Sequence, residues 1–75
     1  MNLNEFIELF AGQFDKTPVD QFKPNTLYKE LDEWDSLTSL SIIAVVDEEL
    51  EKRIVGADFR NSNTIEELFE LIKSK

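Results

Sequence analysis

Apolar residues recur with a helical period at the start of the chain, from Leu3 to Phe14. Their spacing of three or four residues is that of one buried helix face. These apolar positions are Leu3, Phe6, Ile7, Phe10 and Phe14. Asn2 and Glu5 have the spacing of a capping box, in which Asn2 is the N-cap. The pattern predicts an amphipathic helix over 3–14, weakened near its end by Gly12 at roughly 1 kcal/mol relative to Ala.

The next twenty residues, Asp15 to Trp34, show no sustained period. Pro18 and Pro24 exclude a continuous helix there. A structureless loop of this length is uncommon in a small domain, so we expect it to be partly ordered. Four apolar side chains are expected to anchor it to the core: Val19, Phe22, Leu27 and Leu31. We expect Asn25 or Thr26 to cap a short turn through Leu31.

The strongest helical pattern runs from Ser36 to about Arg53. Its apolar positions form a broad face, which predicts a central helix that touches more than one neighbour. This predicted core face comprises Leu40, Ile43, Val46, Leu50 and Ile54, widened by Ile42 and Val45. The β-branched run from Ile42 to Val46 also suits a strand, but the length of the segment and the charged residues around it favour a helix.

Two shorter elements complete the pattern. The segment Val55-Gly56-Ala57 interrupts the helix, and 58–61 is expected to form one irregular turn with Phe59 pointing inward. Thr64 and Glu67 then form a second capping box. The core face of the last helix comprises Ile65, Leu68, Phe69 and Ile72, and Lys73 and Lys75 follow where the helix dipole favours cations.

These elements predict an all-α fold in one domain over 1–75. We expect a small bundle of three or four helices, with a long first loop and a short, irregular third helix. With 41% apolar residues and little glycine or proline, the chain is expected to fold rather than remain disordered.

Composition removes most kinds of chemistry. The chain has no cysteine and no histidine, so it lacks disulfides, thiolate zinc sites and the commonest general base. Its net charge of −8 argues against nucleic acids and anionic membranes and favours basic partners. The acidic cluster at 32–35 lacks the spacing of a calcium loop, and we expect no metal site. The apolar runs are too short to span a bilayer and no secretory signal is evident, so we expect a cytoplasmic location.

Ser36 stands where the central helix begins, between Asp35 and Leu37. A serine nucleophile needs an adjacent base and no histidine can serve, so we do not expect an enzyme. Asp35 or Ser36 would be a favourable N-cap, worth about 1 kcal/mol relative to Ala. Alternatively, another enzyme modifies Ser36, because a helix N-terminus favours an attached phosphodiester. Leu37 has no place on the core face and would then be an exposed docking contact.

The segment Asp35-Ser36-Leu37, with the apolar run and the acidic Asp47-Glu48-Glu49-Leu50 behind it, resembles the second helix of acyl carrier proteins. The first helix, the long loop and the last helix are similar as well, so the resemblance covers nearly the whole chain. It implies that Ser36 bears a 4′-phosphopantetheine arm, transferred from coenzyme A by a phosphopantetheinyl transferase. The arm would hold acyl or aminoacyl thioesters for fatty-acid, polyketide or related biosynthesis, and its thiol would replace the missing cysteine.

Three positions depart from that family. Glu33 stands where housekeeping fatty-acid carriers usually have glycine, and Trp34 is bulkier than the residue expected before Asp35. This form is similar to stand-alone carriers of specialised pathways, including aminoacyl and hydroxyacyl carriers, which leaves the cargo open. Ala44 stands where the family often has methionine, so the recognition surface is expected to be smaller and flatter.

Acidic residues near Ser36 indicate where partners bind. From Lys29 to Lys52 there are eight acidic and two basic residues, a patch that attracts basic docking surfaces and weakens with salt. Expected contact residues are Asp35, Leu37, Asp47, Glu48 and Glu51. The alternative is a solvated face that keeps a small protein in solution. We expect a monomer whose partners are the transferase and the enzymes that load and transfer acyl or aminoacyl groups.

The sequence leaves two questions open: whether the core holds the cargo, and whether the chain is modified at all. Either the core opens to shelter an acyl chain, lined by Phe6, Leu40, Ile43, Val46 and Ile72, or it is simply packed and the cargo is short or polar. The second hypothesis for the whole chain is an acidic helical interaction module that is never modified.

Overall fold

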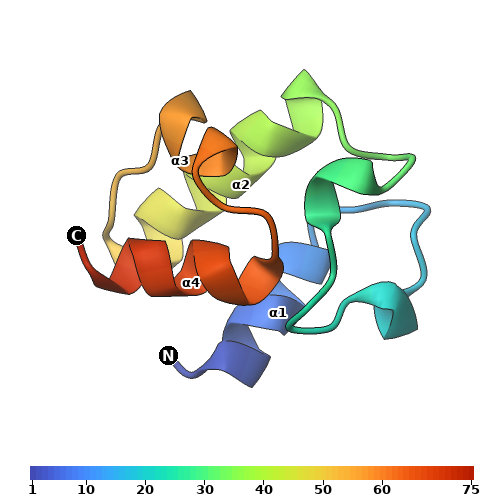
Figure 1. The fold of residues 1–75 in the computed structure, drawn as a ribbon, viewed down its shortest axis with the longest axis horizontal. Coiled ribbons are helices and arrows are strands. Elements are labelled where there is room, and N and C mark those ends of the chain that lie inside the picture. The colour runs from blue at the N-terminus through green and yellow to red at the C-terminus, as the bar shows by residue number, and fades with distance from the viewer.

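The computed structural model describes residues 1–75 and is entirely helical apart from its connections. Four α-helices follow one another: α1 (Leu3–Ala11), α2 (Ser36–Leu50), α3 (Gly56–Arg60) and α4 (Ile65–Lys73). Two short 3₁₀ turns, Val19–Gln21 and Tyr28–Glu30, lie in the connection before α2. An isolated β-bridge pairs Leu27 with Thr64, and no strand forms. The predicted all-α class is confirmed, and Figure 1 shows α4 crossing the bundle against α1 and α3.

Helix α1 begins as predicted but ends earlier. The backbone N–H of Glu5 donates to Asn2 Oδ1 at 2.8 Å and the N–H of Asn2 to Glu5 Oε1 at 2.9 Å, which completes the capping box. The predicted extension to Phe14 is wrong, because the helix ends at Ala11, before Gly12. The N–H groups of Gln13 and Phe14 donate to carbonyls only three residues back, which tightens the chain into a turn. This turn still buries the Phe14 side chain.

Helix α2 stops at Leu50 rather than near Arg53. Glu51 follows it in the left-handed conformation, with φ 56°, and its N–H donates to the carbonyl of Asp47. A left-handed residue at this place ends a helix, because the chain can no longer continue the right-handed turn. Ile54 is buried as predicted, although it lies outside the helix.

The third helix is regular and starts before the turn that the sequence predicts. Its first residue is Gly56, and the N–H of Val55 donates to Asp58 Oδ2 at 2.8 Å, which closes the first turn. Phe59 is buried, as predicted. The capping box of α4 is confirmed, since the N–H of Glu67 donates to Thr64 Oγ1 at 3.1 Å and Glu67 Oε1 accepts from the N–H of Thr64 at 3.3 Å.

The core face of α2 differs from the predicted one. Ile42 and Val46 are fully buried, while Leu40 is 60% exposed. Residues two apart on a helix lie about 200° apart around its axis, so burial of Ile42 turns Leu40 toward solvent. Leu40 therefore cannot line the interior, whereas Phe6, Val46 and Ile72 do belong to it and Ile43 packs partly against it.

The long connection is anchored by aromatic rings rather than by its aliphatic residues. Val19 is 70% exposed and Leu27 46% exposed, so both predicted anchors are wrong. Phe22 is buried as predicted and Leu31 packs partly against the core, but the main anchor is the fully buried Tyr28. The connection is held to the bundle by the side chains that bury apolar area there, and aromatic side chains bury the most.

Polar groups of the connection also differ from expectation. Thr26 does not cap a helical turn: its hydroxyl donates to the Gln21 carbonyl and accepts from the N–H of Lys23, each at 2.8 Å. The second 3₁₀ turn has Leu27 at its N-cap position, without a side-chain cap. The same stretch reaches α4, because the N–H groups of Ile65 and Glu66 donate to the carbonyls of Thr26 and Pro24 at 3.3 and 3.0 Å.

Tyr28 ends in a buried polar cluster beside α3. Its hydroxyl donates to Ser62 Oγ at 2.7 Å, and the carbonyl oxygens of Ser62 and Phe59 lie 3.2 and 3.4 Å from it. Ser62 Oγ in turn donates to the carbonyl of Asp58 at 2.8 Å. Burial raises the pKa of the Tyr28 phenol, so the hydroxyl stays protonated and remains a donor.

We expect Tyr28→Phe to lower the free energy of unfolding by about 1–2 kcal/mol, because it removes hydroxyl hydrogen bonds and keeps the buried ring. Chemical denaturation measures this loss. Ser62→Ala and the double variant complete a cycle, and the two single losses should not add, since the residues share one hydrogen bond. A Tyr28→Phe variant as stable as the parent would contradict this account of the cluster.

None of these helices has the length and apolar character that crossing a bilayer requires; the longest, α2, has 15 residues.

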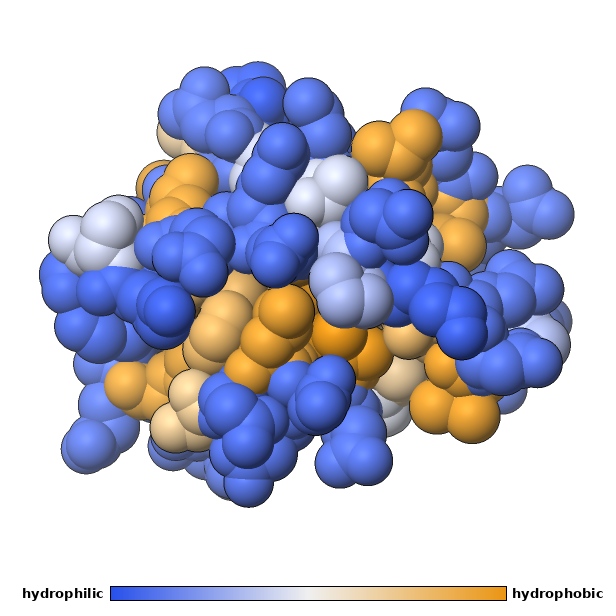
Figure 2. Space-filling model, turned by 60° about the horizontal axis from the view of Figure 1, so that its bottom comes forward, coloured by the Kyte–Doolittle hydropathy of each residue, from blue (hydrophilic) through white to orange (hydrophobic).

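On the side of the molecule where the N-terminus lies, apolar side chains reach the surface in a central area framed by hydrophilic residues (Figure 2).

Candidate functional site

Ser36 is the first residue of α2, and Asp35 is its N-cap. The Asp35 carboxylate accepts the backbone N–H of Thr38 at 2.8 Å. This hydrogen bond is the main reason why the pKa of Asp35 lies below its ordinary value. Of the two capping candidates, the structure therefore uses Asp35, and Ser36 is not needed to begin the helix.

The Ser36 side chain is exposed, and its hydroxyl has no hydrogen-bond partner within the protein. Only the backbone carbonyl of Ser36 is engaged, accepting from Ser39 Oγ at 2.8 Å. A free hydroxyl at the positive end of a 15-residue helix fits the attachment of a phosphodiester. A substituent on Ser36 Oγ would therefore break no hydrogen bond of the fold.

Beside Ser36, α2 presents apolar side chains to solvent. Leu37 is 73% exposed, as the sequence predicts, and Leu40 and Ala44 are exposed as well. Residues 37, 40 and 44 lie within about 60° of one another around the helix axis, so they share one face. We call Leu37, Leu40 and Ala44 the docking face. The two exposed leucines form an apolar patch on this helix face, at the place where the sequence predicts a docking contact.

The predicted acidic contacts extend the docking face along α2. Asp47 and Glu48 are exposed and lie on the same side of the helix, about 16–18 Å along the axis from Ser36. Glu51 is exposed just beyond the end of the helix. The structure therefore separates the predicted residues into a group around Ser36 and an acidic group further along, on one elongated surface.

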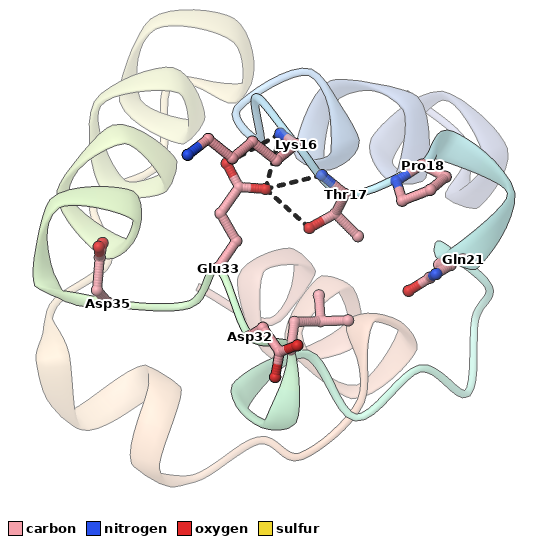
Figure 3. Close-up of a pocket in the computed structure, with 8 residues that line it drawn as sticks. Lys16, Thr17, Pro18, Gln21, Asp32, Glu33 and Asp35 are labelled. Atoms are coloured by element: carbon pink, nitrogen blue, oxygen red, sulfur yellow. Dashed lines mark hydrogen bonds between the residues drawn. The ribbon is translucent and has the colours of Figure 1, made fainter.

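Glu33 forms the most extensive hydrogen-bonded contact near the site, and sequence reasoning gave it no structural role. Its carboxylate accepts the successive backbone N–H groups of Asp15, Lys16 and Thr17 at 2.6, 2.9 and 2.8 Å, and the Thr17 hydroxyl at 2.8 Å. Figure 3 shows the side chain reaching across to this loop. We call these contacts the Glu33 clasp. It ties the loop after α1 to the segment that leads into Ser36.

Charge stabilises the clasp. Removal from water raises the pKa of Glu33, but the hydrogen bonds from the Thr17 side chain and from the three backbone N–H groups outweigh this and lower it to about 2. A carboxylate that accepts several N–H groups is strongly favoured in its ionised form. No local sequence signal predicts this contact, because the donors are backbone groups of a loop 16–18 residues away.

A shallow, open pocket of about 470 Å³ lies beside the clasp, between the loop after α1 and the segment before Asp35 (Figure 3). Its lining is polar except for Leu31 and Pro18, and comprises Lys16, Thr17, Gln21, Asp32, Glu33 and Asp35. No three acidic side chains converge as metal ligands, here or elsewhere in the chain.

Trp34 fills the place between the Glu33 clasp and Asp35. The residue is half-buried, and its ring contacts aromatic residues at distances typical of paired rings. These neighbours are Phe10, Phe14, Tyr28 and Phe59. Trp34, which the sequence analysis gave no place in the core, thus lies at the edge of the core next to Ser36.

Comparisons with protein-family models, with curated proteins and with solved structures found no match for this chain.

Proposed function

We propose that the protein is an acyl carrier: Ser36 is esterified with 4′-phosphopantetheine from coenzyme A, and the arm presents acyl or aminoacyl thioesters to other enzymes. The observation that supports this most is the Ser36 hydroxyl itself, exposed and without a partner at the first residue of α2. Asp35 already caps the helix, so the serine has no structural duty.

The protein's own residues would have three tasks. Ser36 Oγ supplies the attachment oxygen, and the positive end of α2 lies beside the phosphate that it would carry. The Asp35 cap and the Glu33 clasp hold the start of α2 in place. Once bound, the arm supplies the thiol that this cysteine-free chain lacks.

The docking face and the acidic residues beyond it would be read by the phosphopantetheinyl transferase and by loading and transferring enzymes with basic surfaces. The exposed leucines give such partners an apolar contact, and Asp47, Glu48 and Glu51 attract cationic side chains. With its acidic charge the chain would work as a monomer in the cytoplasm, in fatty-acid, polyketide or related biosynthesis.

Intact-mass measurement tests the proposal directly. Incubation with coenzyme A, magnesium and a broad-specificity phosphopantetheinyl transferase should add one phosphopantetheinyl group, and Ser36→Ala should abolish the gain. Because Asp35 is the cap, Ser36→Ala should change the free energy of unfolding by less than about 0.5 kcal/mol. Ser41→Ala, an exposed serine on the same helix, is the matched control and should be modified normally.

The second candidate is an acidic interaction module that is never modified. The exposed leucines of the docking face favour it as much as they favour the carrier, since both need a partner surface. No mass gain under conditions that fully modify a control carrier would contradict the carrier function and leave this module as the better account.

A further inference from the structure

The ring of Trp34 closes the space between the start of α2 and α3. Trp34 directly precedes the N-cap of α2, and its ring lies edge-on at 5.3 Å from Phe59 of α3 and at 5.0 Å from Tyr28. The same ring stacks at 6.4 Å on both Phe10 and Phe14. Any group attached to Ser36 that entered the bundle beside α3 would have to displace this ring from several neighbours at once.

The interior of the bundle offers no vacant volume to such a group. Ile42 and Val46 of α2 and Ile72 of α4 are all 0% exposed, and fifteen buried residues form one core. The molecule has two pockets, and both are open to solvent. A close-packed interior resists added methylene groups, since each forces its neighbours out of their preferred rotamers.

Of the two pockets, the one nearer to Ser36 suits polar groups. The pocket beside Asp35 is lined by Lys16, Thr17, Gln21 and Asp32, and Leu31 is its one large aliphatic residue. The other pocket contains Leu50, Phe69 and Ile72 but lies at the far end of α2, about 20 Å along the axis from Ser36. This pocket thus offers hydrogen bonds, whereas the apolar contact near Ser36 is limited to the exposed leucines of the docking face, which enclose no pocket.

On the basis of the proposed carrier function, we infer that the cargo is a short, polar acyl group, of the aminoacyl or hydroxyacyl class, which stays outside the bundle. Trp34 is the specificity-determining residue, because its ring closes the core to long alkyl chains. Of the two alternatives for the cargo, the filled core and the closed boundary at α3 favour tethering in solvent over sequestration.

Loading the arm with defined thioesters tests this inference. Acetyl, octanoyl and β-alanyl forms are prepared from the corresponding coenzyme A esters with the same transferase, and each is compared with the free-thiol form. We expect one melting temperature for all four, and unchanged methyl resonances for Ile42 and Val46. A melting temperature that rises with alkyl chain length, accompanied by shifts of these methyl groups, would overturn the inference.

Trp34→Leu should remove the ring that closes the core to an alkyl chain. In this variant the octanoyl form is expected to melt at a higher temperature than the free-thiol form, whereas the β-alanyl form is not. Phe59→Leu removes the ring that pairs with Trp34, and it replaces Trp34→Leu in this experiment if that variant does not fold. Phe22→Leu removes a ring that contacts Phe10 and Phe14 but neither Trp34 nor Phe59, so it should show no effect of chain length. Equal behaviour of all variants would contradict the role of Trp34.

The two levels of the hypothesis fail separately. If Ser36 gains the phosphopantetheinyl group but the octanoyl chain enters the parent bundle, only the cargo inference is wrong. If Ser36 is not modified at all, the carrier function is overturned and the cargo inference falls with it.

Discussion

Leu37→Glu is expected to reduce the kcat/KM with which a phosphopantetheinyl transferase modifies Ser36 by roughly ten- to a hundredfold. Leu37 is 73% exposed and adjoins Ser36, so under the proposed function a transferase that reaches the Ser36 hydroxyl also covers Leu37. The variant loses apolar contact area and places a carboxylate in a surface that loses water on binding. Initial rates of mass gain at several carrier concentrations measure the effect.

Val19→Glu is the matched control for this experiment. Val19 is 70% exposed, like Leu37, but belongs to the first 3₁₀ turn rather than to α2. Its replacement should leave the transfer rate within about twofold of the parent's, since surface changes away from a contact have small effects. Equal losses in both variants would show a general effect of charge and contradict a specific docking face.

Glu33→Gln is expected to lower the melting temperature by several degrees at neutral pH and to remove part of the acid sensitivity of the fold. The amide can accept hydrogen bonds from the loop only through its single oxygen and carries no charge, whereas the carboxylate binds three backbone N–H groups and a hydroxyl. The loop after α1 should therefore separate more easily from the segment before Ser36. Thermal unfolding followed by circular dichroism measures both effects.

The pH range of this effect follows from the pKa of Glu33, which is lowered from 4.5 to about 2 in the folded protein. Because the folded state binds the proton less readily, the clasp stabilises the fold fully above about pH 4.5 and is lost as the pH falls toward 2. Asp32→Asn is the control, since Asp32 is the exposed neighbouring acid and makes no hydrogen bond. Its melting temperature should keep the parent's decline over this range, and an equally steep decline in Glu33→Gln would contradict the clasp.

Features that depend on a few neighbouring residues could be predicted from the sequence. Both capping boxes, at Asn2 and at Thr64, formed as expected because each is closed within one turn. The face of α4 was also predicted, since a short amphipathic helix has one way to bury its stripe. Leu37 was expected to be exposed for the same reason: it does not fit the core period.

Features that depend on distant partners could not be predicted. On α2 so many positions are apolar that the sequence predicts one broad face that includes Leu40, whereas in the tertiary structure Ile42 is buried and Leu40 is exposed. Tyr28 is buried because Ser62, 34 residues away, provides a partner for its hydroxyl. The Glu33 clasp depends on backbone N–H groups, which every residue type except proline has, so no side-chain pattern indicates it.

The hydrogen bonds between the connection and α4 make the first turn of that helix a reporter of local opening. Amide groups at the start of a helix ordinarily face water and exchange quickly with deuterium. Here Ile65 and Glu66 donate to Thr26 and Pro24, so their protons exchange only when the connection lifts away from α4. Their protection factors therefore measure the free energy that holds down the stretch leading to Glu33 and Trp34, separately from the stability of the whole protein.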